Sequence, residues 1–261
     1  MAGPGWTELI ALAAAYAIAV IATPAGISGA VLLLPFQVSV LGTPSPAVTP
    51  TNLLYNVLAT PGALYRYRRQ HQATGRLGVL LIAGTLPGVI AGSVIRVVLL
   101  PGPRIFALVM AAVLLPLGAW LAATRPAYTP RPARQIPAPV LIILACTVGC
   151  VGGIYGIGGG SILSPVLIGF GRPAAEVAPA ALASTLVTSI AGVATFTILA
   201  ASHHGPVAPD WPTGIALGLG GLAGAYTGAR LQARVPDLLI RRVVGILAIA
   251  IAARYLASGL H

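Results

Sequence analysis

Charge is scarce in this sequence: only 7% of its 261 residues are Asp, Glu, Lys or Arg, while 57% are hydrophobic. A soluble domain carries charges on about a quarter of its residues, so the composition excludes a soluble globular protein. Apolar stretches of nearly twenty residues recur along the chain, and a stretch of that length can cross a bilayer as a helix. The sequence therefore predicts an all-α polytopic membrane protein.

Lysine is absent, and fifteen arginines face only four acidic residues, which gives a net charge of +11. In a soluble protein such an excess would indicate nucleic-acid binding. Here no basic stripe is interleaved with stacking aromatics, as single-strand binding requires. The arginines lie mostly in connections between apolar segments, where the positive-inside rule places them. We therefore expect the lipid bilayer, and no nucleic acid, among the partners.

Ionisable side chains are missing from the middle of every predicted span. A proton pump normally keeps a carboxylate or histidine there. A membrane-embedded enzyme or heme protein would need a nucleophile, a base or metal ligands at that depth. We therefore expect no proton relay, no enzymatic activity, no cofactor and no bound metal.

Ten apolar segments are predicted, with an Arg/Pro-rich connector at 124–136 between a first repeat (1–123) and a second repeat (137–261). We interpret the first segment as a helix of the mature protein, because Glu8 stands where a secretory signal would be positive. The predicted spans are 7–23, 29–42, 47–66, 76–98, 103–123, 137–153, 159–171, 176–200, 212–231 and 237–257. Spans 29–42 and 159–171 are short for a full crossing, and whether they cross or re-enter is left open.

The two halves repeat the same landmarks in the same order, which indicates an internal duplication. Gly84, Gly88 and Gly92 correspond to Gly220, Gly224 and Gly228, and we interpret both trios as helix-packing faces. Five segments per half is an odd number, so the second half is predicted to be inverted, with both termini outside. The connection around 66–76 holds four arginines and its counterpart at 202–210 holds none, as inversion requires.

Each half contains a Gly-rich helix break within an apolar stretch, at Pro24–Gly29 and at Gly152–Gly160. New helices are expected to begin at Ala30 and Ser161. Their first N–H groups lack intrahelical partners and carry partial positive charge. Two inverted breaks would aim two such helix ends at one point near the midplane. This arrangement predicts a site for a small anion, although the glycines could instead serve only close packing.

Uncharged polar residues follow each break. Spacings of three and four place Asn52, Tyr55 and Asn56 on one helix face, and Ser184 and Thr188 on the matching face. Cys146 and Cys150 are interpreted as small residues of a packed helix, or alternatively as thiols that contact a sulfur-containing substrate. The predicted substrate-binding residues are Gly26, Ser28, Gly29, Asn52, Tyr55, Asn56, Gly156, Gly158, Gly159, Gly160, Ser161, Ser184, Thr185 and Thr188.

Three stretches carry a family resemblance over nearly the whole chain: Gly156–Gly160 followed by Pro165, the parallel Gly26–Pro35, and Pro50–Asn56. With them the chain resembles the sulfite exporter TauE/SafE family of bacterial membrane permeases. The resemblance implies an inner-membrane transporter that moves sulfur-containing anions such as sulfite or organosulfonates, often outward. Ser28 and Ala30 replace glycines of the second break, so we expect an asymmetric site in which Ser28 donates a hydrogen bond.

Several alternatives stay open. The substrate could be another small anion or a carboxylate, and the path could be a channel-like facilitator rather than an alternating-access transporter. An assembly subunit without a transport path is a further alternative, and replacing Gly158 by leucine is expected to separate it from a transporter by abolishing transport without loss of folding. The expected partners are the small anion and the lipid, and a homodimer is an open alternative to the monomer.

Overall fold

The computed structural model describes residues 4–70, 75–100, 136–170, 172–203 and 205–231, with isolated positions between 108 and 256. Every regular element in the five continuous ranges is helical, which confirms the predicted all-α class. The elements are α1 (Pro4–Ala22), the short 3₁₀ turn η1 (Thr23–Ala25), α2 (Ala30–Ser39), α3 (Val48–Arg69), α4 (Gly75–Val98), α6 (Ala138–Tyr155), α7 (Gly159–Gly169), α8 (Ala174–Ala200) and α9 (Trp211–Leu231).

The helices have the lengths and surfaces of an integral membrane protein. Three of them are long and apolar enough to cross a bilayer: Gly75–Val98, Ala138–Tyr155 and Ala175–Ala200. Large apolar side chains point outward from these helices, and Ile198 is 71% exposed. Large exposed apolar side chains are costly in water, whereas the hydrocarbon of a bilayer solvates them.

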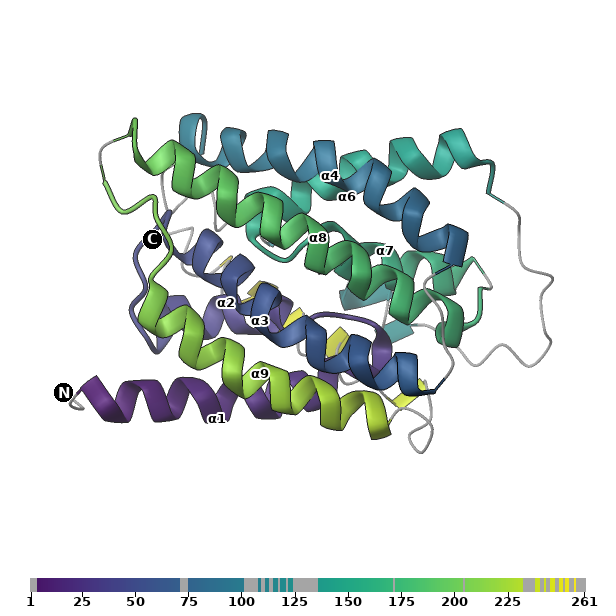
Figure 1. The fold of residues 1–261 in the computed structure, drawn as a ribbon, viewed down its shortest axis with the longest axis horizontal. Helices are drawn as coiled ribbons and strands as arrows, with labels where there is room; N and C mark the ends of the chain where they lie inside the picture. The colour runs from purple at the N-terminus through teal and green to yellow at the C-terminus, as the bar shows by residue number, and fades with distance from the viewer. Residues whose placement is uncertain are drawn as a thin grey trace.

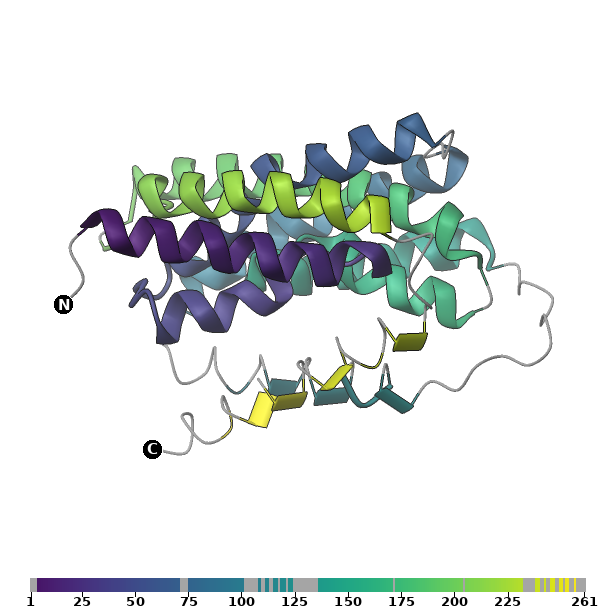
Figure 2. The same ribbon diagram turned by 90° about the horizontal axis from the view of Figure 1, so that it is seen from below.

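The helices pack in two groups that do not follow chain order (Figures 1 and 2). Helix α9, from the second half, packs against α1 and α3, while α4, from the first half, packs against α6 and α8. We call α1, α2, α3 and α9 the first bundle, and α4, α6, α7 and α8 the second bundle. Helices α3 and α8 form the main contact between the bundles. Each half of the chain therefore contributes one helix to the bundle that the other half mainly forms.

Helices that pack together in the first bundle have counterparts in the other half of the chain that pack together in the second bundle. The pair α1 and α9 corresponds to α6 and α4, the pair α3 and α9 to α8 and α4, and α2 and α3 to α7 and α8. In Figure 1, α1 and α3 run from left to right, whereas α6 and α8 run from right to left. Corresponding helices thus have opposite directions.

The two glycine trios pack helices closely, as predicted. A Cβ added at Gly88 would meet the carbonyl of Cys146 and the amide of Cys150 on α6, and one at Gly224 would meet Tyr16 on α1. The other members of the trios make the same kind of contact. Small residues let two backbones approach each other in this way, which favours helix association in lipid.

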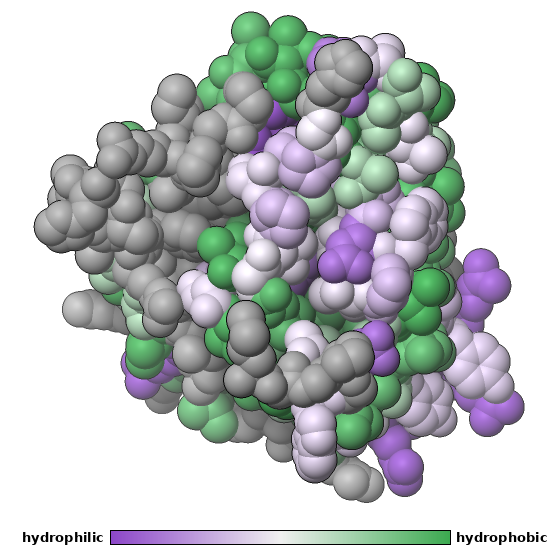
Figure 3. Space-filling model, turned by 90° about the vertical axis from the view of Figure 1, so that its left-hand side faces the viewer, coloured by the Kyte–Doolittle hydropathy of each residue, from purple (hydrophilic) through white to green (hydrophobic). Residues whose placement is uncertain are grey.

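Six of the described arginines gather at one end of the molecule, whereas Arg96 lies near the opposite end, where α4 finishes. The arginine-rich end lies on the right of Figure 1, where α3 and α9 finish and where α4, α6 and α8 begin. At the opposite end, Figure 3 shows apolar and weakly polar surface with only scattered strongly hydrophilic residues. The arginines at the right-hand end are Arg66, Arg68, Arg69, Arg76, Arg172 and Arg230.

The predicted spans up to residue 98 and from 137 to 231 each coincide with one helix to within a few residues. Spans 103–123 and 237–257 and the connector lie mostly outside the described residues. Helices α2 and α7 have 10 and 11 residues, less than a full crossing needs. Whether they re-enter stays a prediction.

The second break is shorter than predicted. Helix α6 continues to Tyr155 and α7 begins at Gly159 rather than at Ser161, so only residues 156–158 leave the helix. Gly152 packs on the backbone of Gly158 and Gly159, with its added Cβ only 2.8 Å from the Gly158 carbonyl carbon. Glycine weakens a helix by about 1 kcal/mol, and this close packing offsets that cost.

Candidate functional site

The two helix breaks meet in the interior. Gly26 follows η1 with a φ of 67°, and Gly156 follows α6 with a φ of 72°, so both turn the chain through the left-handed region that favours glycine. Past the breaks, α2 begins at Ala30, as predicted, and α7 begins at Gly159. The amide of Ser28 donates to Ser161 Oγ at 3.2 Å. This bond joins residues far apart in the chain.

Asn56 on α3 forms hydrogen bonds with both helix breaks. Its Oδ1 accepts a hydrogen bond from Ser28 Oγ, and its Nδ2 donates to the Gly156 carbonyl at 3.4 Å. Ser28 Oγ also accepts from the amide of Ala30 at 3.2 Å. The donation by Ser28 agrees with the expectation for this serine, but the acceptor is Asn56. The Ser28 and Ala30 amides are thus both occupied by protein groups.

Asn52 fastens the start of α2 to α3. Its Nδ2 donates to the Ala30 carbonyl at 2.9 Å, and its Oδ1 accepts from Gln37 Nε2 at 2.9 Å. Tyr55 is buried with its hydroxyl against Gly29. The predicted face of Asn52, Tyr55 and Asn56 therefore does lie against the first break. Gln37, fully buried, is a member of this cluster that the sequence pattern did not single out.

A second polar cluster surrounds the start of α7. Thr85 Oγ1 of α4 lies 2.8 Å from Ser184 Oγ of α8. Thr188 bonds back to the Ser184 carbonyl at 2.7 Å, so its hydroxyl is used within α8. A Cβ on Gly159 would lie 2.6 Å from Thr85 Cγ2. Apart from Thr85, which the sequence pattern missed, these residues were predicted for the site.

Two buried hydroxyls in this second cluster have no hydrogen-bond partner within the described part of the chain: Thr185 Oγ1 and Ser189 Oγ. Thr185 Oγ1 lies 2.7 Å from the position of a Cβ on Gly160, and Ser189 Oγ lies 3.3 Å from that of Gly158. Both hydroxyls therefore face the backbone at the start of α7. A buried polar group without a partner costs about 1–3 kcal/mol, and these two hydroxyls are therefore available to hydrogen-bond a ligand.

Gly158 is held in a conformation that only glycine adopts readily. Its φ is 68°, and an added Cβ would lie 2.8 Å from Thr185 Cγ2. Substitution by leucine would consequently disturb folding as well as the site. The expectation that this change removes transport alone does not fit the geometry, and variants of the hydroxyls are the sharper test.

The two cysteines are half-buried free thiols on α6. Their backbone carbonyls pack against Gly88 and Gly92 of α4, which agrees with a packed helix. Contact between either thiol and a substrate stays a prediction. Within the described ranges, no three His, Cys, Asp or Glu side chains gather as a metal site would require.

Arg96 is a buried cation that the sequence pattern did not single out for the site. It is fully buried near the end of α4. Its Nε donates to Thr49 Oγ1 at 3.3 Å, and Thr49 Oγ1 donates to the Ile154 carbonyl at 3.3 Å beside the second break. The sequence does place Arg96 inside the predicted span 76–98, one turn after Gly92, and this position is the signal that could have indicated its burial.

A model of the sulfite exporter TauE/SafE family matches residues 11–255. In comparisons with curated proteins and with solved structures, nothing matches the chain. The matched range contains both helix breaks and both polar clusters.

Proposed function

The chain belongs to the sulfite exporter TauE/SafE family, a family of membrane transporters rather than enzymes, and from that premise we propose that it carries a small sulfur-containing anion, such as sulfite or an organosulfonate, out of the cell. The proposed location of the protein is the bacterial inner membrane, with both termini outside. A permease for another small anion or a carboxylate is the alternative, and the competitors in the flux experiment below distinguish the two.

The anion site is assigned to the second break, and the two unpartnered hydroxyls of Thr185 and Ser189 carry this assignment. They face the N-terminus of α7, whose first N–H groups and dipole favour an anion. Glycine at positions 158 to 160 lets α4 and α8 pack directly on this backbone, which brings the Thr185 and Ser189 hydroxyls close to it. The amides of Ser28 and Ala30 at the first break are already occupied, so the two breaks have different roles.

The first break is proposed to connect the bundles rather than to hold the anion. Ser28 and Asn56 belong to the first bundle and bond to Ser161 and Gly156 of the second. An inverted repeat is supported by the matching packing partners and by the opposite directions of corresponding helices. Alternating access then follows if one bundle rocks against the other and these bonds open and close.

The test is flux of radiolabelled sulfite into proteoliposomes, with thiosulfate, sulfate and a simple sulfonate as competitors. Thr185→Val and Ser189→Ala each remove one hydroxyl and keep the side-chain shape close to the original. A hydrogen bond to a charged group contributes about 1.5–3 kcal/mol, and 1.4 kcal/mol is a factor of ten. Each variant should therefore lower kcat/KM at least about tenfold.

Thr197→Val is the matched control, because the Thr197 hydroxyl is exposed and bonds only to the Val193 carbonyl of its own helix. Wild-type flux in this control is expected. Wild-type flux in the Thr185→Val/Ser189→Ala double variant would show that the anion does not bind these hydroxyls. A carboxylate that competes better than every sulfur anion would favour the alternative substrate class.

A further inference from the structure

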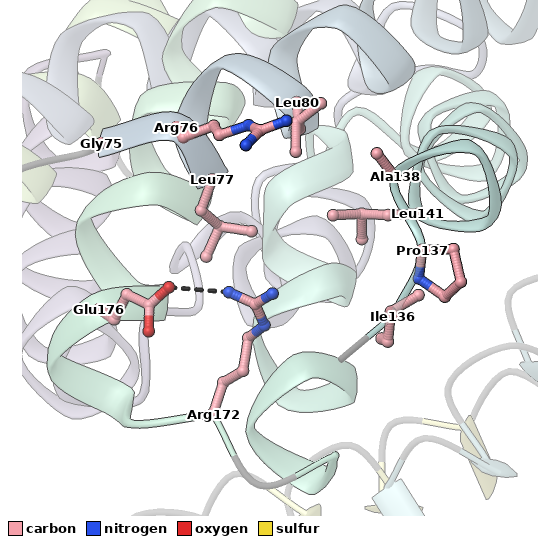
Figure 4. A pocket seen from close by; sticks show the side chains of 10 residues that line it. All are labelled: Gly75, Arg76, Leu77, Leu80, Ile136, Pro137, Ala138, Leu141, Arg172 and Glu176. Atoms are coloured by element: carbon pink, nitrogen blue, oxygen red, sulfur yellow. Dashed lines mark hydrogen bonds and ion pairs between the residues drawn. The ribbon is translucent and has the colours of Figure 1, made fainter. Parts of the chain in front are cut away.

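A cavity of about 570 Å³ opens at the arginine-rich end of the second bundle (Figure 4). It lies where α4, α6 and α8 begin, and its walls are mostly apolar, with Leu77 and Leu141 among them. Among the residues that the structure describes, its charged lining consists of two guanidinium groups, Arg76 and Arg172, and one carboxylate, Glu176. The charged lining therefore has a net positive charge.

The two arginines are unequally engaged. Arg172 Nη1 donates to Glu176 Oε1 at 2.8 Å, and the Arg172 side chain is 22% exposed. Figure 4 shows the Arg172 head extending toward Leu77, while Arg76 extends along the wall near Leu80. A guanidinium has five N–H donors and can hold a second oxygen ligand. The Glu176 carboxylate occupies Arg172 in the way that an oxyanion would.

The cavity is in line with the second polar cluster. Along α8, Glu176 and Thr185 are nine residues apart, which is about 13 Å at 1.5 Å per residue. Helix α4 likewise leads from Leu77 to Thr85, and α6 leads from Leu141 to Gly149, which packs on Thr85. Buried apolar side chains fill the interval: Leu81, Leu163, Leu167, Val177 and Ala181. The cavity is thus closed off from the buried hydroxyls by an apolar layer.

We propose that this cavity is an anion-binding vestibule, in which a sulfur oxyanion displaces Glu176 from Arg172 and is held by Arg172 and Arg76 before it enters the transport site. The inference rests on the proposed function for the identity of the anion. Two arginines concentrate an anion at the entrance, and Glu176 acts as a built-in competitor that keeps occupancy weak enough for release. Charged rings at pore entrances select ions by the same electrostatics.

If Glu176 competes with the anion for Arg172, neutralising Glu176 and neutralising Arg172 should change KM in opposite directions. In proteoliposomes with the arginine-rich end facing the sulfite, Arg172→Gln should raise KM about tenfold. Glu176→Gln should lower KM severalfold, because Arg172 is then freed for the anion. Arg76→Gln should raise KM less than Arg172→Gln. Arg69→Gln is the control, since Arg69 is exposed at the same end but does not line the cavity, and its KM should not change.

Direct binding separates the vestibule from the transport site. The purified Thr185→Val/Ser189→Ala protein should still bind radiolabelled sulfite in equilibrium dialysis, and adding Arg172→Gln should weaken that binding about tenfold. If flux is absent from the unmodified protein while this binding pattern holds, the proposed function fails and the vestibule stands. If Arg172→Gln and Glu176→Gln shift KM and binding in the same direction, or shift neither, the ion pair is only structural and the vestibule is refuted.

Discussion

At the scale of single residues, Arg96 fastens the loop before α3 to the end of α4. Its guanidinium donates to Thr49 Oγ1 and to Ser45 Oγ, and also to the carbonyl of Leu100. A hydrogen bond from a charged donor contributes about 1.5–3 kcal/mol, and its loss leaves buried acceptors unsatisfied. We predict that Arg96→Ala lowers the free energy of unfolding by about 3 kcal/mol, seen as a lower midpoint of thermal unfolding in detergent.

Arg69→Ala provides the comparison, because Arg69 is exposed and lies 5.1 Å from the centre of the Tyr65 ring. An exposed cation–π contact of this kind is worth about 0.5–1 kcal/mol. The Arg69 variant should therefore unfold close to the wild-type midpoint. Equal midpoints for the two variants would contradict a structural role for Arg96.

The sequence predicts the residues of the polar clusters better than it predicts their partners. Helical spacing alone decides that Asn52 and Asn56 share a face, and the structure confirms that this face meets the first break. Their bonds to Gln37 and Gly156 depend on other elements, so no local pattern contains them. The burial of Arg96 likewise depends on the loop around Ser45. The hydropathy at the end of a predicted span does not indicate that a distant loop covers the side chain.

At the scale of helices, close glycine contacts join the two halves of the chain. An added Cβ at Gly88 would lie 2.8 Å from the Cys150 amide nitrogen, and one at Gly224 would lie 2.9 Å from Ala19 Cβ. Overpacking of this kind costs about 1–3 kcal/mol. We predict that Gly88→Val and Gly224→Val each lower the midpoint of thermal unfolding, by similar amounts because the two contacts correspond.

Ala91→Val is the control for this pair, since Ala91 is exposed on the same helix as Gly88. The control should unfold like the wild type. A Gly88→Val protein as stable as Ala91→Val would mean that α4 and α6 can separate freely. Unequal losses at Gly88 and Gly224 would instead argue against equivalent roles for the two trios.

Helix positions were predictable because hydropathy and breakers act locally, and the restart of the chain at Ala30 was predicted correctly. The restart after the second break was wrong by two residues. Gly152 and Gly153 read as helix breakers in isolation, but both pack against neighbouring backbone, at Gly158 and Val89 respectively. Tertiary packing overrides local propensity at such positions, and a single sequence does not contain that packing.

At the scale of the whole molecule, the exchange of α4 and α9 between the halves decides which parts could move together. Chain order divides the protein at the connector, whereas packing places α9 with α1 and α3, and α4 with α6 and α8. Duplication is visible as repeated landmarks in the sequence, but the exchange is a property of contacts alone. The bundles, rather than the sequence halves, are therefore the natural rigid units for the proposed alternating access.

Gly192 on α8 offers a test of this motion, because it faces both bundles at once. A Cβ at this position would lie 2.6 Å from Leu53 Cδ1 on α3, in the first bundle, and 3.3 Å from Val89 Cγ1 on α4, in the second. In a background with Cys146 and Cys150 replaced by alanine, Gly192→Cys can be paired with Leu53→Cys or with Val89→Cys. We predict that oxidation of the Leu53→Cys pair stops sulfite flux, since that disulfide joins the bundles, and that reduction restores it.

The Val89→Cys pair should transport in both redox states, because its disulfide lies within the second bundle and leaves rocking intact. It shares Gly192→Cys with the first pair, so any damage from that substitution affects both proteins equally. Undiminished flux with the bundles linked through Leu53→Cys would favour a static, channel-like path, because alternating access requires α3 and α8 to shift against each other. Loss of flux in both pairs would show instead that α8 moves relative to α4, and the rigid units would have to be redrawn between those two helices.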